Sequence, residues 1–336
     1  MFRVYANKDN KPSKYSKDNI PYTPKKFLKI NGKGVSEGDF TFVFGYPGTT
    51  QQFLTSHAVN QIAKNENPAR IKLRSARLDV YNNAMNESPA QRLRYASGVA
   101  GIANGWKKWI GETKGINRLD VVSKKQDFER KFEIWANVTE QRKEEYSGII
   151  SSFEKTYSEI APLEMSYLYL NEAVLASDFM KNTKDVLSMI KRATKNNYTK
   201  QTSQKEADLL LEKLEKYFNN DYDKHNIVDR TIFIQTMKIF YEDFANKKYN
   251  WIKERIDLNF KSSPEAYFSY VYDNSFLSSK KKAEKALKKF KVEKSLSDPA
   301  VELLSALWGD VIEKDMPRLT ELESKIDSLY RVYVKG

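Results

Sequence analysis

Residues 102–111 combine residue types that could contact a ligand. Asn104 stands here beside Trp106 and Trp109, among small residues. An asparagine carboxamide accepts hydrogen bonds through its oxygen and donates through its nitrogen. In one interpretation, Asn104 offers its amide oxygen to a donor on a ligand. In the other, the segment is a helix with both tryptophans in the core and Asn104 hydrogen-bonded to the backbone.

Residues typical of metal and catalytic centres are scarce elsewhere. The two histidines, His57 and His225, stand far apart without ligand spacing, and the chain has no cysteine, which excludes disulfides and thiolate metal sites. No glycine-rich phosphate loop and no Gly-x-Ser-x-Gly nucleophile turn is present. Carboxylates alternate with lysines, which is typical of solvated helix faces. We therefore expect no catalytic residue, no metal and no cofactor in this chain.

The formal net charge is +13, and lysines are densest in residues 280–294. Such a cluster could contact phosphates or an anionic surface. It could equally be the solvated face of an amphipathic helix, with lysine side chains extending over a stripe formed by Leu287 and Phe290. No arginine stands among these lysines, and the one aromatic residue of the segment, Phe290, belongs to that stripe. The pattern favours the amphipathic helix, and no nucleic-acid partner is expected.

The pattern of elements changes near residue 50. Before it, residues 2–6, 27–30 and 39–44 read as short strands, the last because Phe40, Phe42 and Phe44 alternate with Thr41 and Val43. After it, the chain reads as helix, without a repeat of fixed period. The expected fold is mainly α with a short β-rich N-terminal segment. No segment is long and apolar enough to span a membrane.

Helix starts are marked by capping residues followed by proline. Residues 118–146 and 312–334 are expected to form two long helices. A capping box is expected at Ser203 with Glu206. The expected proline starts are Asn67-Pro68, Ser88-Pro89, Ser263-Pro264 and Asp298-Pro299.

Several segments, in this order and spacing, resemble the serine dipeptidyl aminopeptidases of the dipeptidyl-peptidase 7 and dipeptidyl-peptidase 11 type, serine peptidase family 46. The resemblance covers the whole chain and is strongest over residues 1–111. The segments that carry it are Phe2-Arg3-Val4-Tyr5-Ala6, Tyr15-Ser16-Lys17-Asp18-Asn19, Glu37-Gly38-Asp39, Gly45-Tyr46-Pro47-Gly48-Thr49, Arg70-Ile71-Lys72-Leu73-Arg74, Asn104-Gly105-Trp106-Lys107 and Leu329-Tyr330-Arg331.

The resemblance implies a chymotrypsin-like double β-barrel with a helical domain inserted between the barrels. Residues 1–50 then correspond to the last strands of the N-terminal barrel, and residues 51–336 to the helical cap. The family's Ser-His-Asp triad falls outside this chain, so the chain alone is expected to be inactive. Neither His57 nor His225 falls at the family's catalytic position.

One functional residue carries over: Asn104 matches the asparagine that binds the free α-amino group of the substrate. Gly105 departs from the family, where an aromatic residue is usual. The implied partners are peptides with a free N-terminus, with a homodimer as one expected assembly, and the implied location is periplasmic or secreted. The alternative is a stand-alone basic helical protein, a pseudoenzyme or polyanion binder, that uses the lysines of residues 280–294.

Overall fold

The computed structural model describes residues 3–46, 48–218 and 222–336, without the side chains of residues 216 and 222–225. The chain divides into two compact units, Met1–Gln51 and Gln52–Gly336. Phe2, Pro47 and the side chain of His225, which the sequence analysis singled out, lie outside the described residues.

The first unit contains one small antiparallel sheet in its described part. Strand β1 (Tyr5–Ala6) pairs with β2 (Ile20–Pro21), with Tyr5 opposite Pro21. The loop between them is held by asparagine side chains, since the Asn10 amide nitrogen donates to the Thr23 carbonyl at 2.7 Å. Side-chain-to-backbone bonds of this kind stabilise turns that have no core beneath them.

Two expected strands in this unit are absent from its described residues. Residues 27–30 and 39–44 have no strand structure, and Phe40, Phe42 and Phe44 are 90%, 75% and 96% exposed. Alternation of apolar residues predicts a strand only when a neighbouring strand can satisfy its backbone groups and cover its apolar face. No described segment pairs with them, so the assignment of residues 1–50 to a barrel stays a prediction.

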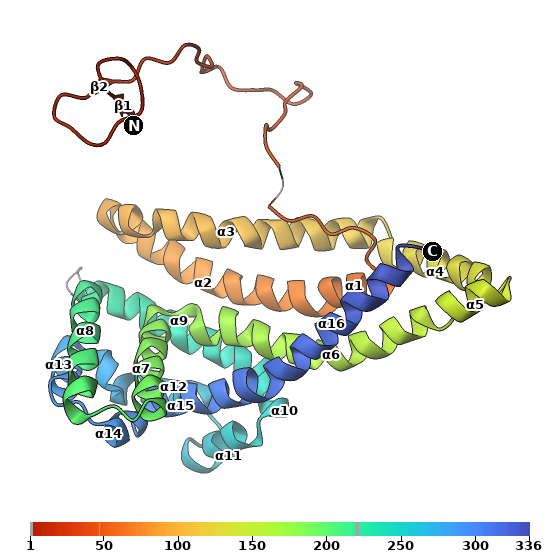
Figure 1. Cartoon of the computed structure of the whole chain (residues 1–336). Coiled ribbons are helices and arrows are strands. Elements are labelled where there is room, and N and C mark those ends of the chain that lie inside the picture. Colours follow the sequence, from red (N-terminus) through yellow and green to blue (C-terminus); the bar gives the residue numbers. More distant parts are fainter. Residues whose placement is uncertain (1–2, 47, 219–221) are drawn as a thin grey trace. The chain divides into compact units, whose positions relative to one another are not determined.

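The second unit is an array of helices (Figure 1). The first half contains α1 (Ser56–Gln61), η1 (Ile62–Glu66), α2 (Asn67–Glu87), α3 (Pro89–Arg118), α4 (Val121–Ala136), α5 (Glu140–Tyr146), α6 (Ile149–Glu172), η2 (Val174–Ala176) and α7 (Asp178–Lys195). The second half contains α8 (Lys200–Phe218), α9 (Tyr222–Phe240), η3 (Tyr241–Ala245), α10 (Asn246–Lys248), α11 (Asn250–Asn259), α12 (Pro264–Asn274), η4 (Phe276–Ser278), α13 (Lys280–Leu287), α14 (Val292–Leu296), α15 (Pro299–Trp308), η5 (Gly309–Asp315) and α16 (Met316–Tyr333).

Three of the predicted helix starts are confirmed. The side chains of Ser88, Ser263 and Asp298 accept hydrogen bonds from backbone N–H groups in the first turns of α3, α12 and α15. The other two are wrong. Asn67 lies within a continuous helical run that starts at α1, and α8 is capped by Thr199, whose hydroxyl accepts from the Thr202 N–H, rather than by Ser203.

The long helix expected over residues 118–146 is interrupted. It forms α4 and α5 as separate helices, and the Thr139 hydroxyl caps α5 by accepting from the Arg142 N–H. The local capping bond competes with helix continuation, as threonine side chains do. The second long helix, expected over residues 312–334, is confirmed as the run formed by η5 and α16.

The main core lies among α7, α9, α12 and α15, where Phe179, Phe233, Phe268 and Val271 are fully buried. A second core joins α4, α5, α6 and α16 around Phe153. The expected stripe of Leu287 and Phe290 is also buried, although residues 280–294 form α13 and the start of α14 rather than one helix. Within the described residues, no helix is both long and apolar enough to cross a membrane.

Candidate functional site

Asn104 lies on α3, which packs lengthwise against α2 (Figure 1). The two helices meet at Ser88, and the cap that this residue provides starts α3 in the reverse direction. The Asn104 side chain is exposed and makes no hydrogen bond to any of the described residues. Its carboxamide therefore keeps both its acceptor and its donors for a ligand.

The helix of the core interpretation is confirmed by α3, but its other two parts are wrong. Trp106 and Trp109 are only half-buried, and Asn104 is not bonded to the backbone. The Trp106 indole N–H donates to the Ser75 hydroxyl on α2 at 2.9 Å. The two tryptophans therefore hold α3 against α2, and Asn104 lies on the solvent-exposed face of α3.

The Asn104 turn of α3 is supported by an arginine of α2 that contacts both α3 and α6. Arg74 on α2 forms two hydrogen bonds to Glu172 on α6, Nε to Oε2 at 2.9 Å and Nη2 to Oε1 at 2.6 Å. Its Nη1 donates to the carbonyl of Ile102 on α3 at 3.1 Å, and the guanidinium lies 4.4 Å from the ring centroid of Trp109. Bidentate and cation–π contacts hold the planar guanidinium in one orientation.

Gly105 makes room for this arginine. A Cβ at position 105 would lie 2.6 Å from the Arg74 Nη1 and 3.4 Å from the Trp109 ring. Arg74 thus occupies the space beside the helix backbone that a side chain at position 105 would need.

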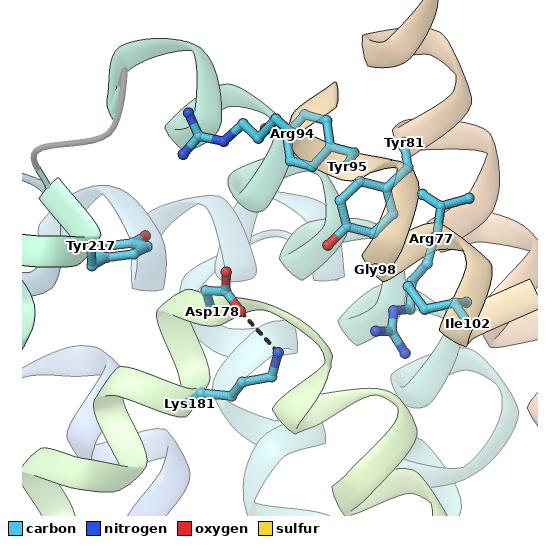
Figure 2. A pocket seen from close by; sticks show the side chains of 10 residues that line it. Arg77, Tyr81, Arg94, Tyr95, Gly98, Ile102, Asp178, Lys181 and Tyr217 are labelled. Carbon is cyan, nitrogen blue, oxygen red and sulfur yellow. Dashed lines mark hydrogen bonds and ion pairs between the residues drawn. The ribbon is translucent and has the colours of Figure 1, made fainter. Parts of the chain in front are cut away.

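A cavity of about 480 Å³ lies on another side of α3. Arg77, Tyr81 and Ile102 contribute to its wall, and the Tyr81 hydroxyl points toward Asp178, which pairs with Lys181 at 2.8 Å (Figure 2). Asn104 is not among its lining residues. Residues two positions apart in a helix project about 200° apart, so Asn104 and Ile102 face opposite ways.

Burial shifts the pKa values of two side chains that line this cavity, Arg77 and Tyr81. It lowers the pKa of Arg77, whose Nε has no hydrogen-bond partner among the described residues and whose Nη1 lies 3.6 Å from Glu172. Burial, reinforced by the charge of Asp178, raises the pKa of Tyr81. Tyr81 therefore stays a neutral hydroxyl and provides no general base.

His57 lies half-buried on α1 without a hydrogen bond to a serine or a carboxylate in the described part of the chain. No group of three or more His, Asp or Glu side chains there is arranged to hold a metal ion. What the geometry offers at α3 is binding chemistry.

Arg74, Ser75 and Glu172 were missed as part of this site. Glu172 lies 98 residues from Arg74, so its proximity cannot be read from local spacing. A signal was nevertheless present. Arg70, Arg74 and Arg77 share one face of a helix at spacings of four and three. Three arginines on one partly buried face require nearby carboxylates or aromatic rings, and here they have Glu66, Glu172 and Trp109.

Comparisons with known proteins identify the family to which this chain is similar. The family profile Peptidase S46 matches residues 1–336. The chain is 34% identical to the Asp/Glu-specific dipeptidyl-peptidase of Flavobacterium psychrophilum and 30% identical to dipeptidyl-peptidase 7 of Phocaeicola vulgatus, covering 100% of this chain and 46% of each relative. It thus spans about half the length of the curated relatives it matches.

A solved structure shows the same fold. The crystal structure of Porphyromonas endodontalis DPP11 in complex with the dipeptide Arg-Glu superposes with a TM-score of 0.70 at 26% identity, covering 99% of this chain and 47% of that chain. The double β-barrel implied by the resemblance is not confirmed by this match. Because the family profile and the relatives cover the whole sequence, the chain belongs to the Peptidase S46 family.

Proposed function

We propose that this chain is the helical part of a serine dipeptidyl aminopeptidase and that Asn104 binds the free α-amino group of the peptide substrate. The observation that carries the proposal is the state of Asn104, an exposed carboxamide without an intramolecular hydrogen bond among the described residues, on a helix held in place by Arg74 and Trp106. The relatives named dipeptidyl-peptidases and a neighbour solved with the dipeptide Arg-Glu support the substrate class.

The chemistry of Asn104 suits this role. Its amide oxygen can accept a hydrogen bond from an ammonium group, and a neutral acceptor avoids the cost of desolvating a second charge. Holding the amino group at a fixed place sets which peptide bond reaches the nucleophile. In this proposal the Ser-His-Asp triad lies outside these residues, and the 336-residue chain alone releases no dipeptide from reporter substrates.

The test uses the full gene product that contains these residues. Asn104→Ala should lower kcat/KM for dipeptidyl substrates with a free amino group by about 2 to 3 kcal/mol, the cost of removing a hydrogen bond to a charged group. Asn104→Asp should retain more of the activity, because a carboxylate also accepts from an ammonium group. The matched control is Gly101→Ala, one turn earlier on the same exposed face of α3.

Three results would contradict the proposal. An unchanged kcat/KM in Asn104→Ala would remove this residue from amino-group binding. Release of dipeptides by the purified 336-residue chain would show that its own residues perform the hydrolysis. A loss of activity in Gly101→Ala equal to that in Asn104→Ala would indicate that α3 as a whole, rather than the carboxamide, had been disturbed.

A further inference from the structure

A groove of about 650 Å³ lies where α12, α13, α14 and α15 meet. Its floor is apolar, formed in part by Phe276, Ala286 and Pro299. Its rim consists mainly of lysines: Lys282, Lys285, Lys288, Lys289, Lys291 and Lys294. The fold thus arranges the lysine-rich segment found in the sequence around a concave surface.

Most of these charges are not neutralised within the described chain. Lys285, Lys289, Lys291 and Lys294 are exposed and have no ion pair with a described residue. Lys288 approaches Glu284 only to 3.7 Å. Like charges gathered at this density repel one another, and an anionic partner relieves that repulsion.

The one carboxylate among the lining residues is already in use. Asp298 is buried, and its oxygens accept hydrogen bonds from the backbone N–H groups of Phe276, Ala300 and Val301. It caps α15 and faces its backbone donors rather than the lysine rim. The rim therefore presents a net positive surface to whatever enters the groove.

We propose that this groove binds an acidic peptide segment in an extended conformation, with carboxylates on the lysine rim and apolar side chains on the floor. Side chains two residues apart in an extended peptide point the same way at about 6 to 7 Å. Lys282 and Lys285, three positions apart on α13, are neighbours at about 5 to 6 Å, and Lys289 continues the row in the turn that follows this helix. The two spacings are similar, so neighbouring carboxylates of such a peptide can reach neighbouring lysines.

The shape of the groove favours a peptide over other polyanions. Its only aromatic lining residue is Phe276, which is partly buried, and single-stranded nucleic acids bind through exposed stacking surfaces. A concave site with an apolar floor is also unlike the flat contact made with a membrane surface. This inference does not depend on Asn104, since the groove involves none of α2, α3 and α6.

The probe is a labelled peptide of alternating glutamate and leucine, acetylated at its N-terminus so that no free amino group takes part. Fluorescence anisotropy with the full chain should show saturable binding that weakens with added salt. Lys285→Glu/Lys289→Glu should weaken it by at least about tenfold, the effect of reversing two contacts of the rim. The control is Lys124→Glu/Lys131→Glu, which reverses two exposed lysines on α4 and should leave binding unchanged.

A second variant tests the floor without changing charge. Ala286→Trp fills the groove and should weaken binding of the glutamate–leucine peptide, with circular dichroism confirming that the helices are retained. Unchanged binding in Ala286→Trp, or equal losses in the two lysine variants, would overturn the groove as the site. Tighter binding of a single-stranded oligonucleotide or of anionic vesicles through Lys285 and Lys289 would overturn the assignment to peptide.

Discussion

Arg74 on α2 and Glu172 at the end of α6 are joined by two parallel hydrogen bonds of 2.9 and 2.6 Å. Their side chains are only 19% and 15% exposed, so solvent screens this pair less than it does the surface pairs of the chain. Because Arg74 also donates to the Ile102 carbonyl, the pair connects α2 and α6 to the turn of α3 that carries Asn104. The position of Asn104, the candidate residue for binding the amino group of a substrate, thus depends on the ion pair between Arg74 and Glu172, which lie 98 positions apart in the sequence.

Replacement of Arg74 by lysine should destabilise the chain although the charge is kept. An ammonium group cannot reproduce the two-pronged bond to Glu172 and stacks poorly on Trp109. We expect Arg74→Lys to lower the free energy of unfolding by about 1 to 2 kcal/mol in urea titrations. Lys72→Ala is the control, since its pair with Asp243 is more exposed and should contribute less than about 1 kcal/mol. Equal losses in the two variants would contradict this view of Arg74.

Gly105→Ala and Gly101→Ala should have opposite effects. Alanine favours a helix over glycine by about 1 kcal/mol, and a Cβ at Gly101 meets no atom within 4 Å, so Gly101→Ala should stabilise. A Cβ at Gly105 would lie 2.6 Å from Arg74 Nη1 and displace the guanidinium, so Gly105→Ala should destabilise despite the better propensity. Urea titration of both variants measures the difference.

Gly105→Ala in an Arg74→Ala background tests whether Arg74 causes the loss of stability. In an Arg74→Ala background the clash at Gly105 disappears, so Gly105→Ala should become stabilising there, as Gly101→Ala is. A Gly105→Ala change that destabilises equally in both backgrounds would mean that the cost does not come from Arg74. The Trp109 ring, 3.4 Å from the same Cβ, would then be the remaining contact.

Local capping signals in the sequence predicted three of the five expected helix starts. Ser88, Ser263 and Asp298 cap the helices that were expected after them, because a capping bond joins atoms only two or three residues apart. The Phe40–Phe44 alternation failed for the opposite reason. A strand depends on a partner elsewhere in the chain, and none of the described residues provides it.

At the candidate site, too, local features could be predicted from the sequence and distant contacts could not. Asn104 could be singled out because its segment resembles a family motif, and the structure leaves its carboxamide exposed. The contacts that hold it, from Arg74 to Glu172 and from Trp106 to Ser75, join residues 98 and 31 positions apart. Tertiary packing creates them, and spacing along the chain does not encode which partner each side chain meets.

Glu164 on α6 should make stability depend on pH near neutrality. Burial, together with the nearby charge of Glu66, raises its pKa from 4.5 to about 7, although Gln61 donates a hydrogen bond to it. The folded state therefore binds this proton more tightly than the unfolded state. The stabilisation is fully present below about pH 4.5 and is lost as the pH rises through 7, with a total change of about 3 kcal/mol.

Glu164→Gln removes this titration. The variant should be more stable than the parent chain at pH 8, where the parent must keep a buried carboxylate charged, and the difference should shrink toward pH 4.5. Urea titrations at several pH values measure it. Glu154→Gln, which changes an exposed carboxylate on the same helix, should show no such trend. A constant difference across the pH range would argue against burial of the charge at Glu164.

Asp229 on α9 should be among the most costly polar residues to remove. It is 1% exposed, and its carboxylate accepts hydrogen bonds from the N–H groups of Asp178 and Phe179 at 2.7 and 2.8 Å, at the start of α7. Asp229→Ala leaves these buried donors unpaired, which should cost about 2 to 4 kcal/mol in urea titrations. Ser177→Ala, which removes an ordinary capping bond to Met180 in the same turn, should cost about 1 kcal/mol. Similar losses in the two variants would mean that water or other groups replace the Asp229 carboxylate, whereas the predicted excess would show that α7 is anchored mainly from α9.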